Sequence, residues 1–179
     1  MEKQTVIFRD LGNVDYQAAW EYQEKLLKQN VRKKSEAGDV KDGEDIADSG
    51  TMHYLLFVEH PPVYTLGKSG NKENVLLNDE ELKEKNIQLF STNRGGDITF
   101  HGNDQIVGYP ILDLEKFYTD IGRYLRNLEE VIILTLEEYG IKGERSAGET
   151  GVWIDTATPG KERKICAIGV RCSRWITMH

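Results

Sequence analysis

Residues 94–102, RGGDITFHG, place an arginine, a glycine pair and a histidine around a short run of β-forming residues. Glycine allows backbone geometries and close approaches that a side chain would block, so the amides of Gly95 and Gly96 could meet a carbonyl or an oxyanion. A simpler interpretation makes the glycine pair a hairpin turn, Arg94 the partner of a surface acid, and His101 a histidine at a strand end. Composition alone favours that simpler interpretation.

The same segment has two distinct faces if it is extended. Ile98 and Phe100 would then share one face of the strand, and Asp97, Thr99 and His101 the other. An apolar wall and a polar edge would therefore coexist in this segment.

Lys164 stands in the second segment of interest, KICAIGVR. An ammonium close to a thiol lowers the thiol pKa and so raises the fraction of reactive thiolate. A solvent-facing lysine on a basic hairpin is the alternative. Cys166 and Cys172 would lie about 20 Å apart on one strand, too far to bond, and their spacing fits no metal site.

Composition limits the classes of protein that these residues can serve. The chain has 179 residues, 39% hydrophobic and 30% charged, which suits one globular domain of residues 1–179. The formal net charge of -7 argues against general nucleic-acid binding. No apolar run approaches the roughly 20 residues that span a bilayer, and the first residues do not resemble a secretory signal, so we predict no membrane association and a cytoplasmic location.

The amino-terminal half must supply elements that hold the first segment. We predict a strand at 5–9, a helix from Asp15 to about Lys33 with Ala19, Leu26 and Leu27 on its buried face, and a mobile loop at 34–51. The apolar run 52–59 predicts a buried strand that bends at a proline pair and resumes in VYTLG. Asn78 should cap a short helix. Strands are then expected at three places, as a meander or as a neighbouring set in one sheet: 87–91, 98–101 and 105–112.

The carboxy-terminal half should carry Lys164 on a hairpin. Asp120 opens a strongly periodic helix that Gly140 ends. Residues 151–155 and 164–172 predict two hairpin strands, with a further strand in WITM. The element order is mixed α and β without regular βαβ alternation, which indicates the α+β class.

Three blocks of the chain resemble the lipoyl(octanoyl) transferase family, also called lipoate-protein ligase B type. They are EHPPVYTLGK, RGGDITFHGNDQIVGYPILDL and KICAIGVRCSRWITMH, in that order. The resemblance implies a biotin/lipoate protein ligase-like fold, class II synthetase-like, in which helices pack on one side of a mixed sheet. It also implies an enzyme that needs no cofactor and no metal.

The implied reaction moves an octanoyl group from octanoyl-acyl carrier protein to a cysteine thiol, and then to a lysine of a lipoyl domain. Such domains occur in 2-oxoacid dehydrogenases and in the glycine cleavage H protein. The resemblance assigns to Lys164 the lowering of the cysteine pKa, and it places two segments around the acyl group, with an apolar tunnel between them. The acyl-binding residues are Arg94, Gly95, Gly96, Asp97, Ile98, Thr99, Phe100, His101, Ala167, Ile168 and Gly169.

The nucleophilic cysteine departs from the family pattern. The family has it in a Pro-Cys-Gly context downstream of the histidine that matches His179, and this chain contains no Pro-Cys dipeptide. Cys166 stands where the family has a small residue or a cysteine, so packing is its expected role. We therefore expect a chain that lacks its nucleophile and its carboxy-terminal part.

Two other functions remain as alternatives. An ATP-dependent lipoate ligase would need a glycine stretch that cradles phosphate, whereas RGGD has two glycines followed by an acid. A noncatalytic module that binds an acyl group or a lipoyl domain would fit the missing cysteine, but it would not need Lys164 as a thiol activator.

Overall fold

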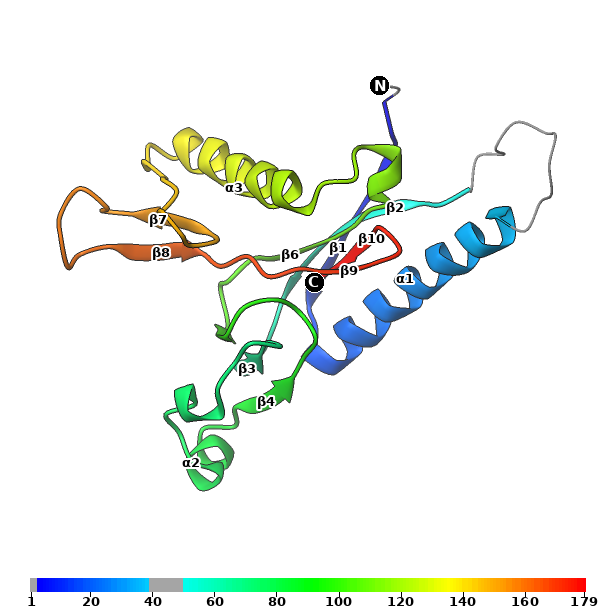
Figure 1. Ribbon diagram of the computed structural model, residues 1–179. Coiled ribbons are helices and arrows are strands. Elements are labelled where there is room, and N and C mark those ends of the chain that lie inside the picture. Colours follow the sequence, from blue (N-terminus) through cyan, green and yellow to red (C-terminus); the bar gives the residue numbers. More distant parts are fainter. Residues whose placement is uncertain (1–2, 39–49) are drawn as a thin grey trace. The chain divides into compact units, whose positions relative to one another are not determined.

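The computed structural model describes residues 3–38 and 50–179 and divides the chain into two compact units (Figure 1). The first unit comprises residues 1–119 and 170–179, and the second comprises residues 120–169. The segment RGGDITFHG therefore belongs to the first unit and Lys164 to the second.

The first sheet of unit one is mixed, with strand order β1-β2-β6. β1 (Val6–Asn13) runs parallel to β2 (His53–Glu59), and β2 pairs antiparallel with β6 (Val107–Ile111). Leu56 and Val58 of the central strand are almost wholly buried. A central strand that is covered on its faces reads as a continuous apolar run, which is why the sequence predicts β2 correctly.

Helix α1 (Tyr16–Gly38) packs on this sheet and forms the main core with it. The predicted stripe of Ala19, Leu26 and Leu27 is confirmed, since each is at most 4% exposed. The helix continues to Gly38, so the predicted loop is wrong for residues 34–38. The Lys34 ammonium lies 2.9 Å from the carboxylate of the buried Asp113, which ties this end of the helix to the rest of unit one. Residues 39–49 of that predicted loop lie outside the described residues.

The second sheet of unit one has strand order β4-β3-β5. It carries residues 94–102, called here the RGG segment. The central β3 (Val63–Leu66) is parallel to β4 (Gln88–Ser91) and antiparallel to β5 (Ile98–His101). The prediction of one bent strand is wrong, because β2 and β3 enter different sheets on either side of the proline pair. Proline cannot donate a ladder hydrogen bond, so pairing stops there.

The predicted set of three neighbouring strands is also wrong. β4 and β5 both pair with β3 rather than with each other, and β6 joins the other sheet. Helix α2 (Asp79–Glu84) follows the prediction, with a capping box between Asn78 and Glu81. Two short 3₁₀ helices, η1 (Lys72–Asn74) and η2 (Leu114–Lys116), complete the connections.

The last residues of the chain return to unit one as a hairpin of β9 (Arg171–Ser173) and β10 (Ile176–Met178). Arg174 and Trp175 form its two-residue turn with positive φ values of 48° and 63°. The Thr177 amide donates to the Leu112 carbonyl at 2.9 Å, which joins the hairpin to the end of β6.

Unit two consists of α3 (Ile121–Glu138) and a hairpin of β7 (Val152–Ile154) and β8 (Arg163–Cys166). Asp120 caps the helix as predicted, by accepting from the Arg123 amide at 2.9 Å. The predicted strand at 164–172 is wrong beyond Cys166, because residues 171–173 pair with β10 instead of continuing along β7.

The membrane prediction concerns long apolar helices. Across residues 3–38 and 50–179, no helix combines the length and apolar character that crossing a membrane requires.

Candidate functional site

Arg94 holds the RGG segment in shape from the inside. The side chain is only 8% exposed, and its guanidinium donates to three backbone carbonyls, those of Thr65 at 2.7 Å, Gly95 at 2.9 Å and Asp97 at 3.1 Å. A fourth bond reaches Thr65 Oγ1 at 2.8 Å. The simpler interpretation, a pair with a surface acid, is wrong, because these donors are committed to the loop itself.

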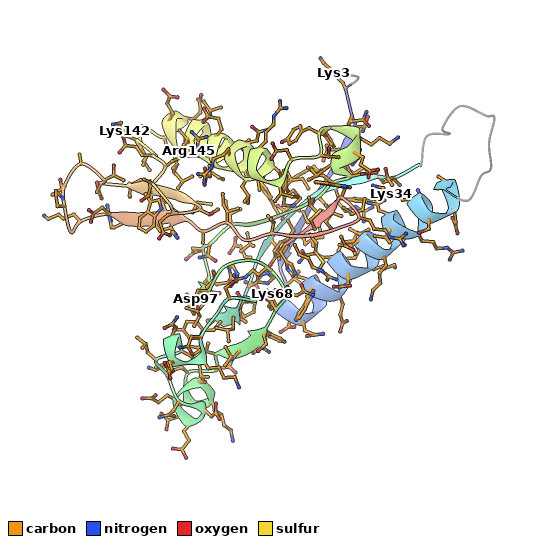
Figure 2. All side chains as sticks on the ribbon, in the orientation of Figure 1. Lys3, Lys34, Lys68, Asp97, Lys142 and Arg145 are labelled. Carbon is orange, nitrogen blue, oxygen red and sulfur yellow. The ribbon has the colours of Figure 1, made fainter. Side chains whose placement is uncertain are left out.

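Gly67 lets the RGG segment approach β3 closely. Its amide donates to the Asp97 carbonyl at 2.9 Å, and a Cβ placed on Gly67 would lie 2.2 Å from the Gly96 carbonyl oxygen. The Lys68 amide adds a bond to the Arg94 carbonyl at 2.9 Å. Figure 2 shows Lys68 and Asp97 near one another beside β3. Sequence reasoning missed Gly67, although the glycine directly after the VYTL strand was a usable signal.

The two glycine amides of the segment differ in availability. The Gly95 amide donates to the Val170 carbonyl at 3.1 Å, so the expectation that both amides are open is wrong for Gly95. Gly96 has a φ of +88°, a conformation that favours glycine. Its amide has no acceptor among the described residues, which makes it the available donor of the pair.

β5 presents the two faces that its sequence predicts. Phe100 is 44% exposed, and its ring packs on Tyr64 with centroids 5.1 Å apart. Thr99 lies opposite Thr65 in the antiparallel ladder, on the other face of the strand. The alternation of Ile98 and Phe100 against Thr99 and His101 is therefore confirmed.

His101 is a neutral histidine at the end of β5. Its Nδ1 lies 2.7 Å from Gln105 Oε1, and its ring faces those of His60 at 5.8 Å and Tyr16 at 6.3 Å. Burial lowers the pKa of His101 to about 4, and the charge of Arg94 acts in the same direction, against the opposing effect of Gln105. The ring is uncharged at neutral pH.

His60 and Tyr109 form a buried polar pair beneath this ring. His60 Nδ1 lies 2.7 Å from the Val14 carbonyl, so Nδ1 carries the proton and Nε2 accepts from the Tyr109 hydroxyl at 2.7 Å. Burial lowers the pKa of His60 and raises the pKa of Tyr109. Sequence reasoning missed both residues, since neither a lone His nor the tyrosine of GYP indicates a partner.

Lys164 lies on β8 of the second unit, between an acid and an aromatic ring. Its Nζ is 3.4 Å from Glu149 Oε2 and 4.7 Å from the centroid of the Trp153 ring, and the side chain is 33% exposed. Lys164 has two partners and is also exposed to solvent, so both the activating role and the alternative interpretation stay open. Sequence reasoning did not single out Glu149 or Trp153.

A buried carboxylate supports the hairpin that carries Lys164. Glu129 is fully buried and accepts from Arg126 at 2.7 Å, from Arg145 at 3.0 Å and from the Gly151 amide at 3.0 Å. Figure 2 shows Arg145 beside α3. Gly151 has a φ of +115°, and a Cβ there would lie 2.4 Å from the Cys166 carbonyl oxygen. Glu129 therefore fixes the glycine against which β8 packs.

Ala167, Ile168 and Gly169 connect β8 to β9 and have no regular secondary structure. Val170, whose carbonyl accepts from Gly95, is the next residue along the chain. Their expected role as the opposing wall of an acyl tunnel would involve both units and stays a prediction.

Neither cysteine of the chain has surroundings that favour a thiolate. Burial raises the pKa of Cys166, and the negative charge of Glu129 raises it further. Burial also raises the pKa of Cys172. Both thiols are free rather than disulfide-bonded. These surroundings disfavour a nucleophilic role for either thiol, and the packing role expected of Cys166 stays a prediction.

Comparison with known proteins identifies relatives over most of the chain. A family model described as the lipoyl protein ligase A/B catalytic domain matches residues 15–179. A protein of Christiangramia forsetii named octanoyltransferase is 58% identical over 171 residues, which are 96% of this chain and 70% of that protein. One of Flavobacterium johnsoniae with the same name is 59% identical, again over 96% of this chain and 71% of that protein.

Solved structures with low sequence identity share the fold. The structure of P. falciparum LipL1 in complex with lipoate has a TM-score of 0.65 at 12% identity and covers 98% of this chain. Lipoate-protein ligase A bound with ATP has a TM-score of 0.59 at 11% identity and covers 99%. The chain spans 46% and 64% of those two solved chains, less than two thirds of each. The α+β, biotin/lipoate ligase-like fold is thereby confirmed.

Proposed function

Because the chain belongs to the lipoyl protein ligase A/B catalytic domain family, we propose that it is an octanoyltransferase of lipoate biosynthesis. The observation that carries this proposal is its identity of 58–59% to two octanoyltransferases over 96% of the chain. The donor is octanoyl-acyl carrier protein, and the acceptors are lipoyl domains of 2-oxoacid dehydrogenases and the glycine cleavage H protein. The site of action is the cytoplasm.

The reaction runs in two displacements. A cysteine thiol loses its proton, and the resulting thiolate attacks the carbonyl carbon of the octanoyl thioester. A new C–S bond forms, the C–S bond to the carrier protein breaks, and the carrier thiolate takes up the released proton. The amine of the lipoyl-domain lysine then attacks the enzyme thioester, an amide forms, and the enzyme thiol takes the proton that the nitrogen loses. Each step needs stabilisation of charge on the carbonyl oxygen, for which the open Gly96 amide is the donor that we assign.

Lys164 serves the thiol in this scheme. Its ammonium favours the thiolate of the attacking cysteine and so lowers that cysteine's pKa. Burial raises the pKa of Cys166 and of Cys172, which disfavours the thiolate form of each. The proposal therefore assigns the acyl group to neither of these two thiols.

Two residues of the RGG segment are assigned the task of holding its shape. Arg94 and Asp97 shape the loop through the hydrogen bonds described above, and Asp97 Oδ1 also accepts from the Asn71 amide at 3.2 Å. Ile98 and Phe100 are assigned an apolar surface for the acyl chain, and Ala167 to Gly169 are the further residues that we assign to the acyl group. A carboxylate in this loop disfavours a phosphate group, which counts against an ATP-dependent ligase.

The deciding experiment incubates the full-length protein with octanoyl-acyl carrier protein and a lipoyl domain, without ATP, and follows the lipoyl domain by intact mass. Octanoylation is expected. Lys164→Ala should slow it by about 10²-fold or more, whereas Lys161→Ala, a neighbouring lysine of the same hairpin, should leave it unchanged. Transfer that required ATP would instead indicate a ligase, and binding without transfer would indicate a noncatalytic module.

The role of the two cysteines can be tested in the same assay. A Cys166→Ser, Cys172→Ser double variant should keep its transfer activity within about threefold of wild type, because neither thiol is proposed to carry the acyl group. A threefold change in rate corresponds to less than about 1 kcal/mol in activation free energy. Peptide mapping of the wild-type protein after acylation should find neither Cys166 nor Cys172 octanoylated. An octanoyl group on Cys166 would contradict the proposed roles.

A further inference from the structure

The orientation of the His101 ring is fixed by one side chain. Gln105 spans the turn after β5, so its Oε1 meets His101 Nδ1 at 2.7 Å while its Nε2 donates to the Phe100 carbonyl at 3.3 Å. The second bond decides which end of the amide faces the ring, because only the Gln105 nitrogen can donate to a carbonyl. Gln105 Oε1 can only accept, so the proton of His101 must sit on Nδ1.

The opposite nitrogen of the ring is left as an acceptor. Among residues 3–38 and 50–179, none hydrogen-bonds to His101 Nε2. The groups that face the ring are Tyr16 from α1, His60 before β3 and the Arg94 guanidinium. His60 is held neutral by the Val14 carbonyl and the Tyr109 hydroxyl. None of these neighbours supplies a negative charge that would favour an imidazolium.

We propose that Gln105 is a positioning residue that holds His101 as the Nδ1–H tautomer, so that the ring offers a lone pair at Nε2 to the attacking amine and cannot donate to the acyl carbonyl. This inference rests on the proposed function, in which the amine of the lipoyl-domain lysine is the reacting N–H donor. One N–H group of this amine donates a hydrogen bond to His101 Nε2. The lone pair of the amine nitrogen is thereby directed at the thioester carbon.

The chemistry of the step is balanced without a proton transfer to the ring. The neutral amine forms the C–N bond, the C–S bond breaks, and the departing thiolate takes the proton that the nitrogen loses. His101 accepts a hydrogen bond throughout and never becomes charged. Its pKa of about 4 makes it a poor base but leaves its lone pair free at every physiological pH.

The tautomer can be measured independently of activity. Two-dimensional ¹⁵N NMR of ring-labelled protein should show His101 with the proton on Nδ1 and an unprotonated Nε2 from pH 5 to pH 8. Gln105→Ala should give a mixture of tautomers, while the spectrum as a whole reports that the fold is kept. A wild-type ring that carries its proton on Nε2 would overturn the proposal.

Single-turnover rates of the two half-reactions test the role. Gln105→Ala should slow the transfer from enzyme thioester to lipoyl lysine by about tenfold, the effect expected from losing one oriented hydrogen bond, and leave acylation by octanoyl-acyl carrier protein unchanged. Gln105→Glu should raise the pKa of His101, because a carboxylate beside the ring favours the imidazolium, which has no lone pair at Nε2. The rate of the second half-reaction of this variant should therefore fall below that of wild type near pH 6 and recover near pH 8. Gln88→Glu makes the same charge change on exposed β4 and should have neither effect.

The outcomes separate the two proposals. Slowing of the acylation step, or equal rates for Gln105→Ala and wild type in the second step, would overturn the role of His101. Absence of octanoyl transfer by the wild-type protein, together with the expected Nδ1–H tautomer, would overturn the proposed function and leave the positioning by Gln105 in place.

Discussion

At the scale of single residues, Arg94 and His101 show why the identity of a residue does not reveal its task. An arginine in a glycine-rich loop suggests a ligand contact. This guanidinium is instead buried, and its N–H groups donate hydrogen bonds to carbonyls of its own sheet and loop. A histidine suggests acid-base chemistry, yet burial keeps His101 neutral. In both cases the environment selects one use from the several that the side chain allows.

Arg94→Lys should destabilise the protein although it keeps the charge. A single ammonium cannot reach the Thr65 and Asp97 carbonyls in the planar geometry of a guanidinium, so buried acceptors lose their partners. We expect a loss of about 2–3 kcal/mol in the free energy of unfolding, measured by urea denaturation. Arg163→Lys, on an exposed pair with Asp155, should change the same quantity by less than about 0.5 kcal/mol.

At the scale of elements, close approaches of backbone to backbone define the frame of the site. Gly67 brings β3 against the RGG loop, and Gly151 brings the start of β7 against β8. Each is a position where a single methyl group has no room. The strands that carry the proposed site residues are therefore positioned by glycines that need take no part in the chemistry.

Gly67→Ala should disrupt the RGG loop. The new Cβ would lie 2.2 Å from the Gly96 carbonyl oxygen, which is backbone and cannot move aside cheaply. We expect a loss of at least about 2 kcal/mol in unfolding free energy and faster amide exchange at Lys68. Gly108→Ala is the matched control, because its Cβ would meet Phe57 at an ordinary 3.5 Å. Equal stability of the two variants would contradict the close packing.

Glu129→Gln should loosen the Lys164 hairpin. The amide keeps the shape of the carboxylate but loses the charge that pairs with Arg126 and Arg145, and leaves these cations without their buried partner. We expect a loss of about 3 kcal/mol in thermal or urea unfolding and weaker exchange protection of the Gly151 amide. Glu137→Gln, on the exposed side of the same helix, serves as control, and its stability should match wild type.

At the scale of the whole molecule, buried neutral histidines couple folding to pH. Burial lowers the pKa values of His60, His101 and His179, the last two to about 4, whereas an unfolded histidine titrates near 6.5. Between these values the unfolded chain binds more protons than the native one. Stability should therefore be full above about pH 7 and fall as the pH drops toward 4.

Urea denaturation at pH 7.5 and pH 5.0 measures this coupling. Each histidine with a native pKa of about 4 should lower the free energy of unfolding at pH 5.0 by roughly 2 kcal/mol relative to pH 7.5. His179→Gln removes one such ring, so its stability should fall by roughly 2 kcal/mol less between the two pH values than that of wild type. Identical pH dependence in the two proteins would show that His179 does not titrate as described.

The sequence by itself determined two kinds of property: local structure, such as helix caps, and the family, which long motifs indicate. Asn78 and Asp120 cap their helices because a cap involves neighbouring residues only, and the stripe of α1 follows from its periodicity. The RGGDITFHG and KICAIGVR segments indicated the family before any contact was known, and the match over residues 15–179 bears this out. The alternation along β5 followed from strand geometry.

Only the tertiary structure decided which distant groups meet. The proline pair divides an apparently single strand between two sheets, and the partner of Arg94 is Thr65, 29 residues away on β3. The neutrality of His101 depends on burial beside α1 and His60, which no spacing along the chain encodes. Strand pairing and burial arise from the free energy of the whole packed chain, so the RGG segment could be located from its residues but its internal hydrogen bonds could not.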